Sequence, residues 1–288
     1  MTNNIIAKAK TKEKEGDIKG AIDLYKIAWR EDSKNIFLQI EIGNLYAVIE
    51  EYEEAAGFFR RSRHALKDNH QVTEALCFCL NKIGNTHFTN REFKMAENAF
   101  EEALSYNKNN APSLFNYGNA LFHQNKYDEA IKVYNLSLKI KPDPNTYNNL
   151  GNALQRIFKT EEAISSYEKA LLINPDLTHT FIQMVHLKQS ICSWGNIDEM
   201  FSKIKKLTEK SINKKISPFA LFSMPNLSNK NHLNSANSWV KQSGIKLLKE
   251  SKQKNIGKVT IAYLSSDFRL HPLYYLIKEV LINHDRDK

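Results

Sequence analysis

Four segments of the chain can be aligned beneath one another: NLYAVIEEYEEAAGFFRRS (44–62), NTHFTNREFKMAENAFEEA (85–103), NALFHQNKYDEAIKVYNLS (119–137) and NALQRIFKTEEAISSYEKA (152–170). Each segment follows a glycine and has a small, an aromatic and a second small residue at fixed places. An earlier copy keeps the last three in Ala21, Tyr25 and Ala28. The first of these small residues recur at steps of 34, 41, 34 and 33 residues, so the chain contains an internal repeat.

The repeated residues predict pairs of helices. A glycine in the first helix lets the second approach closely, and the aromatic residue of the second is expected to fill the gap between neighbouring units. Pro142 and Pro175 follow the second helix in two units, and proline cannot continue a helix. The 41-residue step needs seven additional residues, expected around 67–73, where they would lengthen the second helix of that unit or the loop after it.

This pattern resembles the tetratricopeptide repeat over about residues 2–176, and a degenerate sixth helix pair is expected over 177–210. The resemblance implies a mostly α-helical, right-handed solenoid across residues 2–210. In such a solenoid each unit contacts chiefly its neighbours, and one surface is concave. Tetratricopeptide repeats occur in many unrelated proteins, so they indicate a fold and a binding surface rather than one activity.

Asparagine recurs where this repeat family faces its concave surface, directly after the small residue of the first helix. The positions are Asn44, Asn85, Asn119 and Asn152. Asn116 and Asn149 stand two residues before the glycine in the fourth and fifth units. A ladder of amides can hydrogen-bond the backbone of an extended peptide without regard to its side chains, so we expect protein or peptide partners in this groove. A solvated polar face is the alternative interpretation.

Other candidate sites in the repeats lack the spacing that chemistry requires. Cys77 and Cys79 are two residues apart on a predicted helix and point in different directions, so we expect them in the core rather than on a metal. The sequence contains no HExxH and no phosphate-binding glycine motif. Neither a metal nor a resident cofactor is therefore expected.

Charge and cysteine content restrict the setting of the protein. The formal net charge is +9, and much of the excess is lysine between residues 203 and 258. The few aromatic residues of this stretch, Phe219, Phe222 and Trp239, are not interleaved with its lysines as stacking on bases would require, so a solvated surface is expected rather than a nucleic-acid site. No segment has the length and apolar character of a membrane span. Three cysteines in 288 residues favour a reducing, cytoplasmic location.

The repeat pattern stops after about residue 210. Residues 211–255 are predicted to be a linker followed by a helix near 230–252. The nearly continuous apolar run over 259–264 then suits a buried parallel strand, 265–271 a polar turn, and Pro272 the first position of a helix. Residues 256–288 therefore predict the first strand–loop–helix of an α/β sheet, in which ligand sites gather at the carboxyl ends of strands.

This C-terminal region resembles the protein O-linked N-acetylglucosamine transferase family in its bacterial form. The resemblance rests on Cys192 and Trp194 near the last repeat unit, the segment from Pro218 to Pro225, YLSSDFRLHP (263–272) and NHDRDK (283–288). It implies two Rossmann-like catalytic lobes, a UDP-GlcNAc or other UDP-sugar donor, no metal, and transfer to Ser or Thr of proteins that the solenoid recruits. His271 matches the family's active-site histidine, and Asp267 matches the acidic position of the same loop.

The chain ends after one predicted strand and helix, so we expect it to supply mainly the acceptor-binding half and to be inactive alone. The alternative is a non-enzymatic tetratricopeptide scaffold. The chaperone-binding subset of the family carries lysine four positions before the groove asparagine. Those positions hold Ile40, Asn81, Phe115 and Asn148, so that form of scaffold is not expected.

Overall fold

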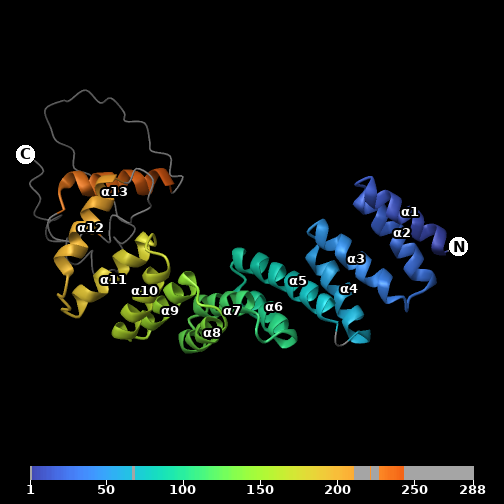
Figure 1. Cartoon of the computed structure of the whole chain (residues 1–288), viewed down its shortest axis with the longest axis horizontal. Coiled ribbons are helices and arrows are strands. Elements are labelled where there is room, and N and C mark those ends of the chain that lie inside the picture. The colour runs from blue at the N-terminus through green and yellow to red at the C-terminus, as the bar shows by residue number, and fades with distance from the viewer. Residues whose placement is uncertain (1, 67–68, 211–220, 222–226, 243–288) are drawn as a thin grey trace, which may run out of the picture. The chain divides into compact units, whose positions relative to one another are not determined.

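The computed structural model describes residues 2–66, 69–210, 221 and 227–242. The chain divides into two units, 1–243 and 244–288, and all of the described residues belong to the first. Thirteen helices occur in this part of the chain (Figure 1), and no strand occurs there. They are α1 (Thr2–Lys14), α2 (Ile18–Glu31), α3 (Ile36–Val48), α4 (Tyr52–Ala65), α5 (His70–Thr89), α6 (Phe93–Tyr106), α7 (Ala111–His123), α8 (Tyr127–Ile140), α9 (Pro144–Arg156), α10 (Thr160–Ile173), α11 (Thr178–Ser190), α12 (Ile197–Lys210) and α13 (Asn229–Gln242).

The first ten helices form five pairs, and each pair is joined by a three-residue turn. Side-chain caps begin α3, α5, α7 and α9: Asn110 Oδ1, for example, accepts from the backbone N–H of Ser113 at 2.9 Å at the start of α7. Substantial contacts link only helices that are one or two places apart in the described chain. The predicted repeat array is therefore confirmed as a one-dimensional stack of helix pairs.

The repeated glycine lies under the repeated aromatic ring of its own unit. A Cβ at Gly118 would lie 2.5 Å from Cε1 of Tyr134, and one at Gly151 would lie 2.5 Å from Cε1 of Tyr167. The same relation holds for Gly84 with Phe100 at 2.5 Å and for Gly43 with Phe59 at 2.9 Å. The close approach that the sequence predicted is thus a contact of glycine backbone with a ring.

The seven additional residues of the long step are placed differently from the prediction. α4 has 14 residues, like the other second helices, and ends at Ala65, whereas α5 has 20 residues where α3, α7 and α9 have 13. The expectation that they lengthen the second helix of the earlier unit or the loop after it was therefore wrong. They extend the first helix of the next unit at its N-terminal end, where Val72 and Leu76 are buried.

A buried carboxylate joins the third unit to the fourth. Glu97 on α6 is 5% exposed, and its Oε2 accepts from Lys126 Nζ at 2.8 Å and from Gln124 Nε2 at 2.7 Å. Lys94 Nζ donates to the other oxygen at 2.9 Å. Because both oxygens are satisfied, this charge can be buried at the junction between the units.

Beyond the five pairs, α11 and α12 occupy 178–210, where the sequence predicts a sixth pair, and α12 contacts α13. Asn231 Nδ2 donates to Thr208 Oγ1 at 2.9 Å between these last two helices. The predicted strand–loop–helix over 256–288, with His271 and Asp267, lies outside the described residues. Among the helices that are described, none is both long enough and apolar enough to cross a bilayer.

Candidate functional site

The six asparagines predicted to line the groove lie on the first helices of their pairs. Asn44 on α3 and Asn85 on α5 are exposed. Asn116 and Asn119 on α7, and Asn149 and Asn152 on α9, are partly buried. Asn116 forms no side-chain hydrogen bond within the described part of the chain.

Tyrosine hydroxyl groups hold two of these amides in one orientation. Tyr134 donates to Oδ1 of Asn119 at 2.8 Å, and Tyr167 donates to Oδ1 of Asn152 at 2.8 Å. Oδ1 of Asn119 also accepts from Nδ2 of Asn149 at 2.8 Å, which links neighbouring units. With the carbonyl oxygens occupied, the Nδ2 groups of Asn119 and Asn152 are left without a partner among the described residues. These two amides therefore present hydrogen-bond donors.

The other two units lack this arrangement because their aromatic residues are Phe59 and Phe100, which have no hydroxyl group. The side chains of Asn44 and Asn85 accordingly form no hydrogen bond in the described chain. The four equivalent asparagines are thus two different kinds of surface group: two fixed and two unfixed.

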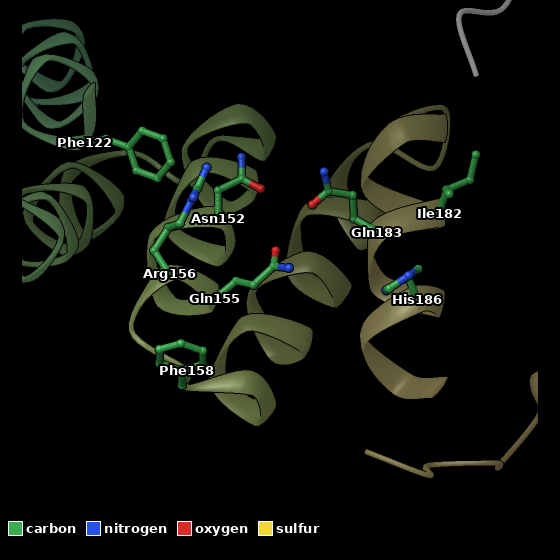
Figure 2. Close-up of a pocket in the computed structure, with 8 residues that line it drawn as sticks. All are labelled: Phe122, Asn152, Gln155, Arg156, Phe158, Ile182, Gln183 and His186. Carbon is green, nitrogen blue, oxygen red and sulfur yellow. The ribbon is translucent and has the colours of Figure 1, made fainter. Parts of the chain in front are cut away.

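A hollow of about 780 Å³ lies beside Asn152, between α9 and α11 (Figure 2). Its lining comprises Phe122, Asn152, Gln155, Arg156, Phe158, Ile182, Gln183 and His186. Figure 2 shows Asn152 and Gln155 on one side, with Gln183 and His186 opposite them. First helices supply every lining residue except Phe158, which lies in the turn after α9.

The Tyr167 hydroxyl group lies within hydrogen-bond distance of three amides that line this hollow. Besides Asn152, its oxygen lies 3.3 Å from Oε1 of Gln155 and 3.2 Å from Oε1 of Gln183. A hydroxyl group has one proton and donates to one oxygen at a time, and the contact with Oδ1 of Asn152, at 2.8 Å, is the shortest of the three. Burial raises the pKa of Tyr167, which keeps that proton in place at neutral pH.

A second hollow of about 280 Å³ shares Phe122 and Asn152 with the first and continues it across α7. Asn119, Asn149, Phe88 and His123 also line it. The His123 ring stacks on Phe93 with centroids 4.9 Å apart, and burial with the nearby Arg91 charge lowers the pKa of His123. The two hollows therefore form one surface, the amide face, which runs from α7 to α11.

The amide face has no acidic residue on its three main helices. α7, α9 and α11 contain no Asp or Glu, whereas they carry His123, Arg156, His179, His186 and Lys188. Burial lowers the pKa of His179, so this ring is neutral at pH 7. Arg156 is exposed and forms no ion pair within the described chain. Lys188 is paired with Glu168 of α10 at 2.7 Å, so Arg156 is the fixed positive charge of these three helices that has no ion-pair partner among the described residues.

Sequence analysis found the asparagines but missed most of the other lining residues. Gln155, Arg156 and Phe158 follow Asn152 within one segment, but only the fold brings them opposite Gln183 and His186 of the next unit. The Tyr134–Asn119 and Tyr167–Asn152 pairs share a 15-residue separation that was available in the sequence as a signal. In the described residues, no group of three or more His, Cys, Asp or Glu side chains is placed to hold a metal ion.

Models of known families match the middle of the chain. A TPR repeat model matches residues 118–157, and tetratricopeptide repeat models match 79–110, 99–132 and 144–177. These residues are tetratricopeptide repeats. The matched region includes α7 and α9, which carry Asn119 and Asn152 of the amide face. The family models show no glycosyltransferase region, and no curated protein matches the sequence.

Solved structures of tetratricopeptide proteins are similar at low identity. YrrB, described as a TPR protein with an unusual peptide-binding site, is 23% identical across 61% of this chain and 88% of its own, with a TM-score of 0.44. MamA is 23% identical across 59% of this chain and 90% of its own, also at 0.44. The first TPR of Spaghetti (RPAP3), solved with an HSP90 peptide, is 21% identical across 40% and 93%, at 0.40.

Proposed function

We propose that this protein is a tetratricopeptide-repeat scaffold that binds an extended segment of a partner protein along the amide face. The observation that carries the proposal is the pair of tyrosine–asparagine hydrogen bonds, which turn the Nδ2 groups of Asn119 and Asn152 toward a ligand. An extended chain presents backbone carbonyl oxygens that accept such donors whatever its side chains are.

The dimensions and polarity of the hollow suit this function. Its volume of about 780 Å³ lies within the range typical of ligand sites. Asn152 and Gln155 have amide nitrogen atoms without a partner in the described chain, while the partly buried Phe122 adds apolar contact area. Because the fold already holds these amide donors in one orientation, they lose little conformational entropy when a ligand binds.

Asn81 and Asn148 stand at two of the positions that hold lysine in chaperone-binding repeats, and here both form hydrogen bonds between units. Asn81 Nδ2 donates to Ser113 Oγ at 2.7 Å, and Thr180 Oγ1 donates to Asn148 Oδ1 at 2.7 Å. Both bonds join consecutive units. Recognition of a terminal carboxylate by lysines at these positions is therefore not part of the proposal.

The test is selection of random dodecapeptides by the full chain, followed by affinity measurements with the selected peptides. Replacing both fixed amides (Asn119→Ala with Asn152→Ala) should weaken binding about tenfold or more, because two hydrogen bonds to the ligand are lost. The matched control is Asn98→Ala with Asn135→Ala, which removes two exposed amides from α6 and α8. Equal affinities in the two double variants, or no selected peptide, would exclude the amide face as the binding site.

A second function is proposed for the chain as part of a larger catalytic assembly. The motif YLSSDFRLHP supports an O-linked N-acetylglucosaminyltransferase in which the amide face receives the acceptor and His271 and Asp267 belong to the catalytic loop. Histidine could assist deprotonation of an acceptor hydroxyl group because its pKa lies near neutrality. This proposal rests on residues outside the described ranges and on their resemblance to that family.

Calorimetric titration of residues 1–288 with UDP-GlcNAc should show no micromolar binding, since the motif at 263–272 supplies few of the groups needed to hold a nucleotide sugar. In a longer relative, the His→Ala change at the position matching His271 should abolish most transfer to a peptide substrate. An unchanged transfer rate would remove this histidine from the catalytic site.

A further inference from the structure

In each of the first five helix pairs, the turn that joins the two helices has one residue in a left-handed conformation. In the first pair this middle residue is Gly16, with φ of 83°. In the next four pairs it is Glu50, Arg91, Asn125 and Phe158, with φ between 61° and 64°. Glycine and asparagine adopt this conformation readily, whereas a bulky aromatic residue does so rarely and at a cost in stability.

Phe158 gains no packing that offsets this cost. Its side chain is 89% exposed, the highest value among the exposed large hydrophobic residues of the described chain. An aromatic ring held in water by a strained backbone is disfavoured both by solvation and by conformation. The residue nevertheless lies on the rim of the 780 Å³ hollow, on the same side as Arg156 in Figure 2.

Arg156 adds an unneutralised charge to the same rim. It is exposed, it has no ion-pair partner in the described chain, and the helices that form the hollow supply no carboxylate. Glu161 and Glu162, the first acidic residues after Phe158 in the sequence, line a different hollow on α10, and Glu162 is paired with Lys159 at 3.3 Å. An arginine in such a setting is complementary to a carboxylate, which it can bind through two parallel hydrogen bonds.

We propose that the amide face selects an extended segment in which an Asp or Glu side chain binds Arg156 and an adjacent bulky apolar side chain contacts Phe158. This inference rests on the proposed peptide-binding function and states which side chains of the peptide are selected. Backbone carbonyl groups of the ligand bind the amide donors, and the two rim residues select the side chains. Phe158 thus destabilises the fold of the free protein, and in the complex it contributes apolar contact area.

Selection of random dodecapeptides by the full chain tests the specificity directly. We expect enrichment of an acidic residue next to a large apolar residue, and an affinity that falls as salt concentration rises. Arg156→Gln should weaken the selected peptides about tenfold, because a charge-assisted pair is lost. Changing the peptide's acidic residue to its amide should cause a similar loss in the wild-type chain and little further loss in Arg156→Gln.

Phe158→Gly separates binding from folding. This variant should unfold at a higher temperature than the wild type, because glycine adopts the left-handed conformation without strain, yet it should bind the selected peptides about fivefold more weakly. Glu50→Gly is the matched control at the same turn position in a unit remote from the hollow. It should also raise the unfolding temperature, and it should leave the affinity unchanged.

The outcomes distinguish this inference from the proposed function. Selected peptides that need Asn119 and Asn152 but show no acidic enrichment would overturn the specificity and leave the binding function standing. Unchanged affinity in Phe158→Gly would remove the aromatic contact from the inference. A phosphoserine that binds more than about tenfold tighter than the acidic residue would overturn the assignment of Arg156 to a carboxylate.

Discussion

In the units of α3–α4 and α5–α6 the ring that covers the glycine is phenylalanine, whereas in those of α7–α8 and α9–α10 it is tyrosine. This one hydroxyl group determines whether the neighbouring asparagine on the surface is held as a hydrogen-bond donor. Asn119 and Asn152 are held as donors, while Asn44 and Asn85 remain unfixed. A buried core position therefore determines the chemistry of an exposed one, and only in the C-terminal units of the array.

The N-terminal and C-terminal regions of the array also differ in the charge of their surfaces. A hollow of about 410 Å³ near the N-terminus is lined by residues of both signs, including Lys10, Glu13 and Glu41. Burial and repulsion by Glu13 raise the pKa of Glu41. The amide face, by contrast, has no acidic residue on its main helices. One repeated scaffold thus carries two surfaces that suit different ligands.

The largest effect is expected where a glycine supports a ring. Gly151→Ala should destabilise the chain by about 1–3 kcal/mol, because the new Cβ would lie 2.5 Å from the buried ring of Tyr167. Gly57→Ala on α4 has open space around the added Cβ and should stabilise by about 0.5–1 kcal/mol through helix propensity. Chemical denaturation measures the change in free energy of unfolding for both variants. If both variants were stabilised, or both destabilised, the glycine–ring contact would be contradicted.

The junction between the two regions should respond to acid. Burial would raise the pKa of Glu97, but hydrogen bonds from Lys126, Lys94 and Gln124 outweigh it and lower the pKa below its ordinary 4.5. The resulting stabilisation is complete above that ordinary value and is lost as pH falls through the lower value of the folded state. Glu97→Gln should cost about 1–2 kcal/mol at pH 7 and little at the acid end. Unfolding curves across pH 2–7 provide the comparison, and a constant difference would contradict the assignment.

Exchanging the rings tests whether the hydroxyl groups cause the difference between the regions. Tyr167→Phe should cost about 0.5–1.5 kcal/mol and weaken peptide binding, since Asn152 loses its orienting donor. Phe100→Tyr makes the reverse change and should fix the amide of Asn85, which can be followed by the NMR signals of its side-chain amide group. An unaffected Asn85 signal would show that the hydroxyl group alone does not create the donor.

The smallest effect is expected in the N-terminal hollow. A carboxyl group whose pKa is raised in the folded state loses stability as pH rises from its ordinary value through the folded one. Glu41→Gln should therefore raise stability at pH 7 by no more than about 0.5 kcal/mol and have no effect near pH 4. Thermal unfolding at the two pH values tests this, and destabilisation at pH 7 would mean that Glu41 is favourably paired.

The repeat itself was predictable from the sequence, because its steric requirements are local and recur at a fixed spacing. A glycine, an aromatic ring and small residues fix how two helices cross; five copies of the pattern predicted the helix pairs, and four of them gave the asparagine positions. The extension of α5 was not predictable from spacing alone, since the seven additional residues fit equally well on either side of the break. Their placement depends on Val72 and Leu76 finding buried positions.

What the sequence determined by itself was the stack of helix pairs and the register of Asn119 and Asn152 within it. The tertiary structure alone decided which atoms of those amides are available, because the Tyr134 and Tyr167 hydroxyl groups reach them only when the helices pack. It also decided which residues share the hollow, since Arg156 and His186 belong to different units. Hydrogen bonds and charge complementarity act over a few ångströms, and such distances between units are set by folding rather than by spacing along the chain.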